Sequence, residues 1–238
     1  MLISIEGNIG TGKTTLMHYI KSLYSENCKV VFIEEPVDLW LQLKSSDGEN
    51  ILEKFYKNKT RWSYSFQMHA FITRAQEIMK QDQNKVIIIE RSVLTDRNVF
   101  AKLLAETNDI SDLEWKLYDE WFNWLTIKFK EILPQLYIYI RADTNTSYQR
   151  MLKRNRKEEC SVDFEYIKQV KKKHDDWLLN ETSVPVVTID VNNDFVESDE
   201  FRNTILQSIS DIINSQIESL PKSASESSLE ELVEMTRC

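Results

Sequence analysis

The sequence predicts an α/β fold in which a five-stranded parallel sheet is covered by helices on both faces. The main observation is that five short apolar runs, rich in β-branched residues, alternate with segments long enough to be helices. Strands that alternate with helices in this way form parallel sheets with both faces buried. In addition, the 238 residues include only 4 Gly and 4 Pro, which argues against a turn-rich all-β sandwich or barrel. A chain of this length can bury a sizeable core.

Each predicted strand is an apolar run that is too short to form a helix of comparable burial. The runs are Leu2–Glu6, Lys29–Glu34, Val86–Glu90, Leu136–Ile140 and Val186–Ile189. The first four are each followed by a segment of helix length, and the segment between the first two has room for one crossover helix.

Longer helical patterns occupy much of the remaining chain. After a polar loop at Lys44–Gly48, we expect helices over Trp62–Gln81, Asp112–Ile132, Thr144–Arg154, Asp163–Leu179 and Ser198–Ile217. After Pro221 the composition becomes serine-rich and acidic. Residues 1–220 are therefore predicted to form the domain, and residues 221–238 a mobile tail. An alternative is that Leu229–Met235 forms one amphipathic helix on a partner.

The charge and cysteine content narrow the classes of partner and compartment. The chain has 30 Lys and Arg against 38 Asp and Glu, so its net charge of −8 would repel nucleic acid and anionic membranes unless a basic patch reversed the sign locally. Three cysteines at no metal-ligand spacing indicate a reducing compartment without a disulfide framework. No apolar stretch approaches the roughly 20 residues of a membrane span, and no signal segment precedes the first strand. We expect a soluble cytoplasmic protein with no nucleic-acid or membrane partner.

One motif near the start contains three of the four glycines. Residues 7–14, GNIGTGKT, match the phosphate-loop pattern G-x-x-x-x-G-K-[ST] directly after a predicted strand and before a helical pattern. Glycines let backbone N–H groups approach a phosphate chain, and the N-terminus of the following helix attracts its charge. Lys13 adds a cation for the outer phosphates, and the Thr14 hydroxyl can ligate Mg²⁺. The motif predicts an ATP or GTP site formed by Gly7, Asn8, Ile9, Gly10, Thr11, Gly12, Lys13, Thr14 and Thr15.

Other features separate the classes of nucleotide-using protein. A GTPase would need a guanine-reading Asn-Lys-x-Asp motif, and the nearest string, residues 58–61 (NKTR), lacks the acid. The third predicted strand ends in Glu90 and Arg91, at the sheet edge where α/β proteins bind ligands. The second strand ends in Glu34 and Glu35. Because neighbouring strand residues point to opposite faces, we expect only one of these two to face that edge, and alternation alone leaves open which one.

Six segments together resemble deoxyribonucleoside kinases, especially the deoxycytidine and deoxyguanosine kinase branch. They are ISIEGNIGTGKTT (3–15), EEPVDLW (34–40), RWSYSFQMHAFITR (61–74), IIERSVLTDRNVF (88–100), RMLKRNRKEE (150–159) and VNNDF (191–195). The similarity runs from about residue 2 to residue 217. It implies a P-loop NTPase type of fold with a helical lid at about residues 150–160. It also implies Mg²⁺-assisted transfer of the γ-phosphoryl group of ATP to the 5′-hydroxyl of a deoxynucleoside, in nucleotide salvage.

The resemblance assigns the residues of phosphoryl transfer. Glu35 corresponds to the general base at the 5′-hydroxyl, which leaves Glu34 facing away or solvated. Arg91 corresponds to the arginine beside the 5′-oxygen and the transferred phosphate, and a structural ion pair with a neighbouring carboxylate is compatible with that role. Glu90 corresponds to an acid near Mg²⁺, together with Thr14. The expected catalytic set therefore consists of Lys13, Glu35 and Arg91.

The expected nucleoside pocket combines helix spacing with the resemblance. Gln67 and Arg74 lie two helical turns apart with Ala70 between them, which leaves a slot for a base edge but also fits an ordinary exposed face. By resemblance, Gln67 pairs with the base, and Arg74 forms with Asp96 the pair that accompanies cytosine and purine acceptance. Such a pair blocks the space of a thymine methyl group, so we expect deoxycytidine or purine deoxynucleosides over thymidine. The resemblance also implies Tyr56 and Glu159 at the sugar 3′-hydroxyl, and pocket walls at Val37, Trp40, Leu52, Phe66 and Phe100.

The segment from residue 150 to residue 159 carries five cations against two acids, in a chain that is acidic overall. From charge alone, this cluster fits a solvated surface as well as a binding site. The resemblance makes it the lid over the triphosphate. The donor residues so implied are Arg150, Arg154 and Arg156, which clamp the phosphates, and Asp194 and Phe195, in the loop around the donor base.

Two other functions would also fit a phosphate loop in an α/β fold. A nucleoside monophosphate kinase of the thymidylate kinase type would share the sheet, loop and lid, but Glu35 would repel its phosphorylated acceptor. A non-catalytic nucleotide-binding subunit would be expected to have a damaged site, yet the catalytic set and the lid arginines are present. Related kinases are commonly homodimers with helices at the interface, so we expect a homodimer. The tryptophans expected to line the core and the subunit contact are Trp115, Trp121 and Trp124.

Overall fold

The sheet has the predicted architecture. The computed structural model describes residues 1–159 and 162–220, so the predicted tail lies outside the described residues. Five parallel strands form one sheet in the order β2-β3-β1-β4-β5, which confirms the predicted α/β class. The strands are β1 (Leu2–Glu6), β2 (Val30–Ile33), β3 (Val86–Glu90), β4 (Leu136–Arg141) and β5 (Val186–Asp190).

Helices connect these strands and cover the sheet. The α-helices are α1 (Lys13–Leu23), α2 (Val37–Gln42), α3 (Ile51–Lys57), α4 (Lys59–Met79), α5 (Val93–Thr95), α6 (Lys102–Glu106), α7 (Asp112–Lys128), α8 (Thr144–Arg154), α9 (Phe164–Asp175) and α10 (Asp199–Glu218). Two π-helices, η1 (Asp96–Ala101) and η4 (Asp176–Glu181), and two 3₁₀-helices, η2 (Lys130–Ile132) and η3 (Lys157–Glu159), complete the described elements. None of the helices in the described ranges combines the length and apolar composition that a membrane span requires.

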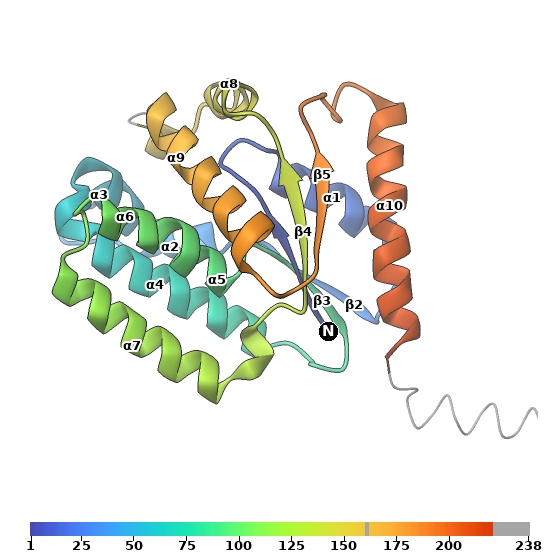
Figure 1. Ribbon diagram of the computed structural model, residues 1–238, viewed down its shortest axis with the longest axis horizontal. Coiled ribbons are helices and arrows are strands. Elements are labelled where there is room, and N and C mark those ends of the chain that lie inside the picture. Colours follow the sequence, from blue (N-terminus) through green and yellow to red (C-terminus); the bar gives the residue numbers. More distant parts are fainter. Residues whose placement is uncertain (160–161, 221–238) are drawn as a thin grey trace, which may run out of the picture.

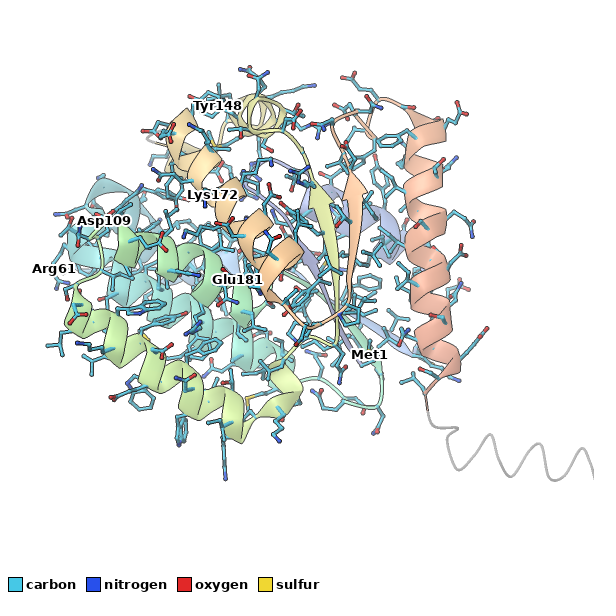
Figure 2. All side chains as sticks on the ribbon, in the orientation of Figure 1. Met1, Arg61, Asp109, Tyr148, Lys172 and Glu181 are labelled. Atoms are coloured by element: carbon cyan, nitrogen blue, oxygen red, sulfur yellow. The ribbon has the colours of Figure 1, made fainter. Side chains whose placement is uncertain are left out.

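The two faces of the sheet are covered by different helices. Alternate strand residues point to opposite faces, so Ile3 and Ile5 of β1 pack with residues of α1 and α10. Leu2 packs on the other face, in a core that includes residues of α4 and α7. Figure 1 shows α1 and α10 on one side of the sheet and α4, α7 and α9 on the other. Side chains fill the layers between helices and sheet (Figure 2), so the described residues form a three-layer structure.

Several helix boundaries differ from the sequence prediction, each for a local reason. The helix predicted over Asp112–Ile132 ends at Lys128, because Phe129 leaves the helical region (φ −125°, ψ 78°) and a 3₁₀ turn follows. The helix predicted over Asp163–Leu179 changes to a π-helix after Asp175. The helix predicted from Trp62 begins three residues earlier, at Lys59, where the Asn58 side chain caps the backbone N–H of Arg61.

Four short α-helices, α2, α3, α5 and α6, were not predicted, because they are too short to show helical periodicity. One of them has a start signal in the sequence. The Asn50 side chain accepts from the Glu53 N–H (2.8 Å), and the Glu53 carboxylate accepts from the Asn50 N–H (3.1 Å). This is a reciprocal capping box, with Asn in place of the usual Ser or Thr.

The phosphate loop packs so closely against its neighbours that two of its residues must be glycine. Gly12 lies directly before α1 with φ +91°, and a Cβ there would come within 2.8 Å of the Phe195 ring. Gly10 has φ +82°, and its Cβ would lie 2.1 Å from the backbone oxygen of Ser147 in α8. The loop is therefore held between α8 and the segment that follows β5.

The fold makes one prediction about acid stability, which concerns His174 on α9. This side chain is completely buried, with Nδ1 2.8 Å from the Val170 carbonyl oxygen and its ring stacked on Tyr139. Burial lowers the pKa of His174 from 6.5 to about 3. In the unfolded chain, His174 binds a proton near pH 6.5, whereas in the folded chain it binds one only near pH 3. The free energy of unfolding should therefore fall as the pH drops through this window.

We expect His174→Gln to remove this contribution, about 2 kcal/mol between pH 6.5 and pH 5, as measured by urea unfolding. A His174→Gln profile parallel to that of the wild-type protein would contradict the assignment.

Candidate active site

Two adjacent cavities open at the carboxyl ends of the central strands. Cavity A, of about 370 Å³, is lined mainly by residues of α2, α3, α4 and η1, by the two glutamates that follow β2 and by the end of β3. Cavity B, of about 420 Å³, is lined by the phosphate loop, the end of α8 and the segment from Asp194 to Glu197. Both volumes lie in the range of small-molecule sites. The residues that line both cavities are Lys13, Thr14, Glu90, Arg154 and Arg156.

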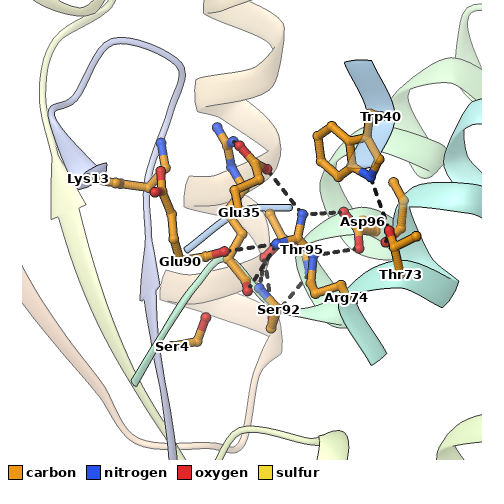
Figure 3. A network of polar contacts seen from close by, with 12 residues as sticks. Ser4, Lys13, Glu35, Trp40, Thr73, Arg74, Glu90, Ser92, Thr95 and Asp96 are labelled. Atoms are coloured by element: carbon orange, nitrogen blue, oxygen red, sulfur yellow. Dashed lines mark hydrogen bonds and ion pairs between the residues drawn. The ribbon is translucent and has the colours of Figure 1, made fainter. Parts of the chain in front are cut away.

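A buried chain of charges runs along one wall of cavity A (Figure 3). Glu35, just after β2, accepts from Nη1 of Arg91 at 3.0 Å on both carboxylate oxygens and from Nη2 of Arg74 at 3.1 Å. Arg74, on α4, also donates from Nε to Asp96 at 2.9 Å and from Nη1 to the backbone oxygen of Glu90 at 2.8 Å. These bonds fix the Glu35 carboxylate between two guanidinium groups, on the wall of cavity A.

This arrangement sets the protonation state of the site. Burial alone would raise the pKa of Glu35, but Arg91, Arg74 and Lys13 outweigh it and bring that pKa down to about 2. The carboxylate is therefore ionised throughout the neutral range. Burial and the neighbouring Arg91 lower the pKa of Lys13 to about 7, and its Nζ donates to the Asn8 backbone oxygen at 2.8 Å. An anionic phosphate close to Nζ would favour the charged form of this lysine.

The wall shared by the two cavities includes two oxygen-bearing side chains suited to a hard cation. The Thr14 hydroxyl lies 3.0 and 2.9 Å from the two carboxylate oxygens of Glu90, which is itself almost fully buried. Within the described residues, no group of three or more His, Cys, Asp or Glu side chains could hold a metal by itself. The donor set therefore fits Mg²⁺, which usually takes one or two protein oxygens and completes its shell with phosphates and water.

The inner part of cavity A has the properties expected of a base pocket. Gln67 is buried, and its Oε1 has no hydrogen-bond partner among the residues that the structure describes. The Trp40 indole is fixed by a 3.0 Å bond from Nε1 to Thr73 and by edge contact with Phe66. The predicted residues that line this cavity are Glu35, Val37, Trp40, Leu52, Tyr56, Phe66, Gln67, Ala70, Arg91, Asp96, Phe100 and Glu159. Arg74 is the one predicted pocket residue that does not line the cavity. Its guanidinium lies behind the wall, where it donates hydrogen bonds to Glu35 and Asp96.

The strand-alternation argument for Glu34 and Glu35 was wrong, because β2 ends at Ile33 and both glutamates lie beyond it. Both residues border cavity A. The Glu34 carboxylate, however, pairs with His18 (3.4 Å) and Lys21 (3.2 Å) of α1, and 41% of the side chain remains exposed. Only Glu35 joins the buried chain of charges.

The predicted lid arginines have different surroundings. Arg154 donates to Glu159 at 2.5 and 2.7 Å, and Arg156 lies 4.0 Å from the same carboxylate. Arg150 lines cavity B, but its guanidinium donates to the backbone oxygens of Val191 (2.6 Å) and Asn193 (3.1 Å). Arg150 therefore ties α8 to the loop around Asp194 and Phe195, which also line cavity B.

The sequence prediction missed two aromatic residues of cavity A. Phe55 lies on the unpredicted helix α3 and stacks on Phe66. Tyr166 lies on the first turn of α9, under the Lys59 ammonium group at 4.0 Å. The buried positions of α9 follow a helical period that marks Tyr166 as inward, but periodicity does not separate a core residue from a cavity wall.

The comparisons with known proteins agree with this geometry. The family model for deoxynucleoside kinases matches residues 3–214. The chain is 38% identical to a probable deoxycytidine kinase of fowlpox virus, covering 89% of this chain and 88% of that protein. It is 34% identical to the deoxycytidine kinase of Homo sapiens, covering 83% and 86% of the two chains, and 30% identical to a mitochondrial deoxyguanosine kinase of Xenopus laevis, covering 85% and 87%. The resemblance drawn from the motifs is confirmed, and the chain belongs to the deoxynucleoside kinase family of phosphotransferases.

Proposed function

We propose that the chain forms one kinase domain over residues 1–220 and transfers the γ-phosphoryl group of ATP to the 5′-hydroxyl of a deoxynucleoside. Deoxycytidine or a purine deoxynucleoside is preferred over thymidine. The observation that carries the proposal is the shared wall: Lys13, Thr14, Glu90, Arg154 and Arg156 border both cavities, so a phosphoryl group at that wall can be reached from either side. Cavity B then takes the donor and cavity A the acceptor.

The donor is bound mainly by backbone and by cations. The phosphate loop presents N–H groups at the N-terminus of α1, where the helix dipole favours negative charge. Lys13 and the lid residues Arg154 and Arg156 stabilise the charge on the transferred group. The oxygens of Thr14 and Glu90 would hold Mg²⁺, which would neutralise part of the phosphate charge when it is bound.

The acceptor hydroxyl is oriented by Glu35. The ionised carboxylate accepts a hydrogen bond from the 5′-hydroxyl, the 5′-oxygen forms a bond to the γ-phosphorus as the bond to the ADP oxygen breaks, and the proton passes to Glu35. With its pKa held near 2, Glu35 is a weak base, so orientation contributes more than proton affinity. Arg91, bonded to Glu35 and facing the same cavity, stabilises the transferred group.

Base selection follows from the inner wall of cavity A. The unpaired Gln67 Oε1 suits an N–H donor on the base edge, such as the amino group of cytosine or adenine. Asp96, held by Arg74, takes up space beside it, which disfavours the thymine methyl group. Tyr56 and Glu159 also line cavity A, and we assign them to the sugar 3′-hydroxyl. A monophosphate acceptor, by contrast, would bring its phosphate against the Glu35 carboxylate.

We also propose that the enzyme is a homodimer. The large apolar side chains exposed on α7 are Leu113, Leu117, Trp121, Trp124 and Ile127, and those on α4 are Ile72 and Met79. Of the three tryptophans predicted at the core and contact, Trp115 packs against the core, whereas Trp121 and Trp124 are about half exposed. Side chains project outward from α7 in Figure 2, and an apolar stripe of this kind fits a second copy of the chain. The free, exposed Cys28 favours a reducing compartment, and we propose the cytoplasm.

The substrate assignment predicts the outcome of a competition assay. With ATP as donor, kcat/KM should be highest for deoxycytidine or a purine deoxynucleoside and lower for thymidine, because Asp96, held in place by Arg74, takes up the space of the thymine methyl group. Thymidine monophosphate should not be phosphorylated. A kcat/KM that is much higher for thymidine than for the other deoxynucleosides would contradict the base assignment. A preference for thymidine monophosphate would contradict the acceptor class.

The role of Glu35 predicts a selective loss of turnover. Glu35→Gln should retain ATP binding but lower kcat by about 10²-fold or more, because it removes the group that orients and accepts the hydroxyl proton. Glu34→Gln is the matched control: it changes the neighbouring carboxylate, which pairs with α1, and should leave kcat near the wild-type value. Near-normal turnover of Glu35→Gln would remove it from this role.

The dimer proposal predicts a change in molecular mass on disrupting α7. Wild-type protein should sediment as a dimer, and Trp121→Glu combined with Trp124→Glu should shift it to the monomer mass, because charges on the stripe oppose its burial. Leu179→Glu, at an exposed apolar position on η4, is the control and should remain dimeric. Monomeric wild-type protein would refute the proposal.

A further inference from the structure

Glu6 is a completely buried carboxylate that lies outside both cavities and has no part in the mechanism above. It ends β1, directly before the first residue of the phosphate loop. Its three side-chain partners are all hydroxyl groups: Oε1 accepts from Ser4 (2.7 Å) and Ser92 (2.9 Å), and Oε2 accepts from Thr95 (2.6 Å). Ser4 belongs to the same strand, whereas Ser92 and Thr95 come from the turn after β3.

That turn carries Arg91 in an uncommon backbone conformation. Arg91 has φ +60°, a left-handed geometry that is unfavourable for residues other than glycine and persists only where the surroundings hold it. Its N–H donates to the Ile5 carbonyl oxygen at 3.0 Å, so the turn is anchored to β1. In this conformation the Arg91 side chain points back across the sheet edge to Glu35.

Ser92 and Thr95 form a reciprocal capping box around the three-residue helix α5. The Ser92 N–H donates to Thr95 Oγ1 at 3.0 Å, and the Thr95 N–H lies 3.3 Å from Ser92 Oγ. In this box each hydroxyl oxygen accepts from the backbone N–H of the other residue, but these two bonds do not fix the turn relative to the sheet. The Glu6 carboxylate accepts from both hydroxyls at once and thereby joins the turn to the end of β1.

We propose that Glu6 is a positioning residue that holds the turn from Arg91 to Thr95 and, through it, keeps the Arg91 guanidinium against Glu35 at the phosphoryl-transfer site. The inference rests on the proposed function for the role of Arg91. Glu6 acts only through Ser92 and Thr95, so its effect is on the geometry of the transfer step and leaves substrate binding in the two cavities in place.

The test measures kcat, KM and the hydrogen exchange of the backbone amides at 91–95 in a set of near-isosteric variants. Glu6→Gln should lower kcat by roughly tenfold to a hundredfold with little change in KM for either substrate, because a displacement on the order of 1 Å is enough for such a loss. Thr95→Val should act in the same direction, and Thr95→Ser, which keeps the hydroxyl, should recover most of the turnover. Hydrogen exchange of the amides at 91–95 should accelerate in Glu6→Gln and Thr95→Val.

Ser4→Ala is the matched control, because it removes a hydroxyl from the same carboxylate without touching the turn. It should leave kcat and the exchange at 91–95 unchanged, whatever its melting temperature. In an Arg91→Gln background, Glu6→Gln should lower kcat no further, because both changes remove the same contribution. If Glu6→Gln fails to fold, Thr95→Val and Thr95→Ser carry the same comparison.

Wild-type kcat in Glu6→Gln or in Thr95→Val, or an equal loss of kcat in Ser4→Ala, would overturn the inference. A fully additive loss in the Arg91→Gln background would also overturn it, since Glu6 would then act elsewhere. A wild-type protein inactive on every deoxynucleoside would refute the proposed function instead, and the exchange measurement would still decide whether Glu6 holds the turn.

Discussion

The site depends on one buried carboxylate held between two guanidinium groups. Glu35 receives hydrogen bonds from Arg91, which follows β3, and from Arg74 on α4, so three separate parts of the chain meet at its two oxygens. Arg74 extends the contact to Asp96 on η1. Removing one member of a buried set like this leaves an uncompensated charge, at a cost of about 3–5 kcal/mol. The electrostatics that keep Glu35 ionised therefore also hold cavity A in shape.

The two halves of the site are built from different chemistry. Cavity B uses backbone N–H groups, which require close approach, and three of the chain's four glycines stand in its loop. Cavity A discriminates by side chains, namely a buried glutamine, an aromatic wall and an ion pair, and none of its lining residues is a glycine. Under the proposed assignment, donor binding is thus tied to main-chain geometry, whereas acceptor choice can change with single side chains.

The sequence predicted the sheet and the phosphate loop well because both leave direct signals. Buried parallel strands appear as continuous apolar runs, and a loop that needs left-handed backbone shows its glycines. It could not predict contacts that tertiary packing decides. Helical spacing places Arg74 on a face with Gln67 but does not say that its guanidinium is occupied by Glu35 and Asp96. Glu6 at a strand end is indistinguishable in sequence from a solvated acid until the turn after β3 is folded beside it.

The central claim is that the two cavities hold donor and acceptor on either side of one shared wall. The most direct measurement is calorimetric binding of a two-headed analogue in which adenosine and deoxycytidine are joined through their 5′-oxygens by a polyphosphate. We predict one analogue per chain, an affinity well above that of ATP or deoxycytidine alone, and competition with both, because the linked ligand gains from its effective concentration at the second cavity. An analogue that binds no more tightly than ATP, or that leaves deoxycytidine binding unaffected, would contradict the account.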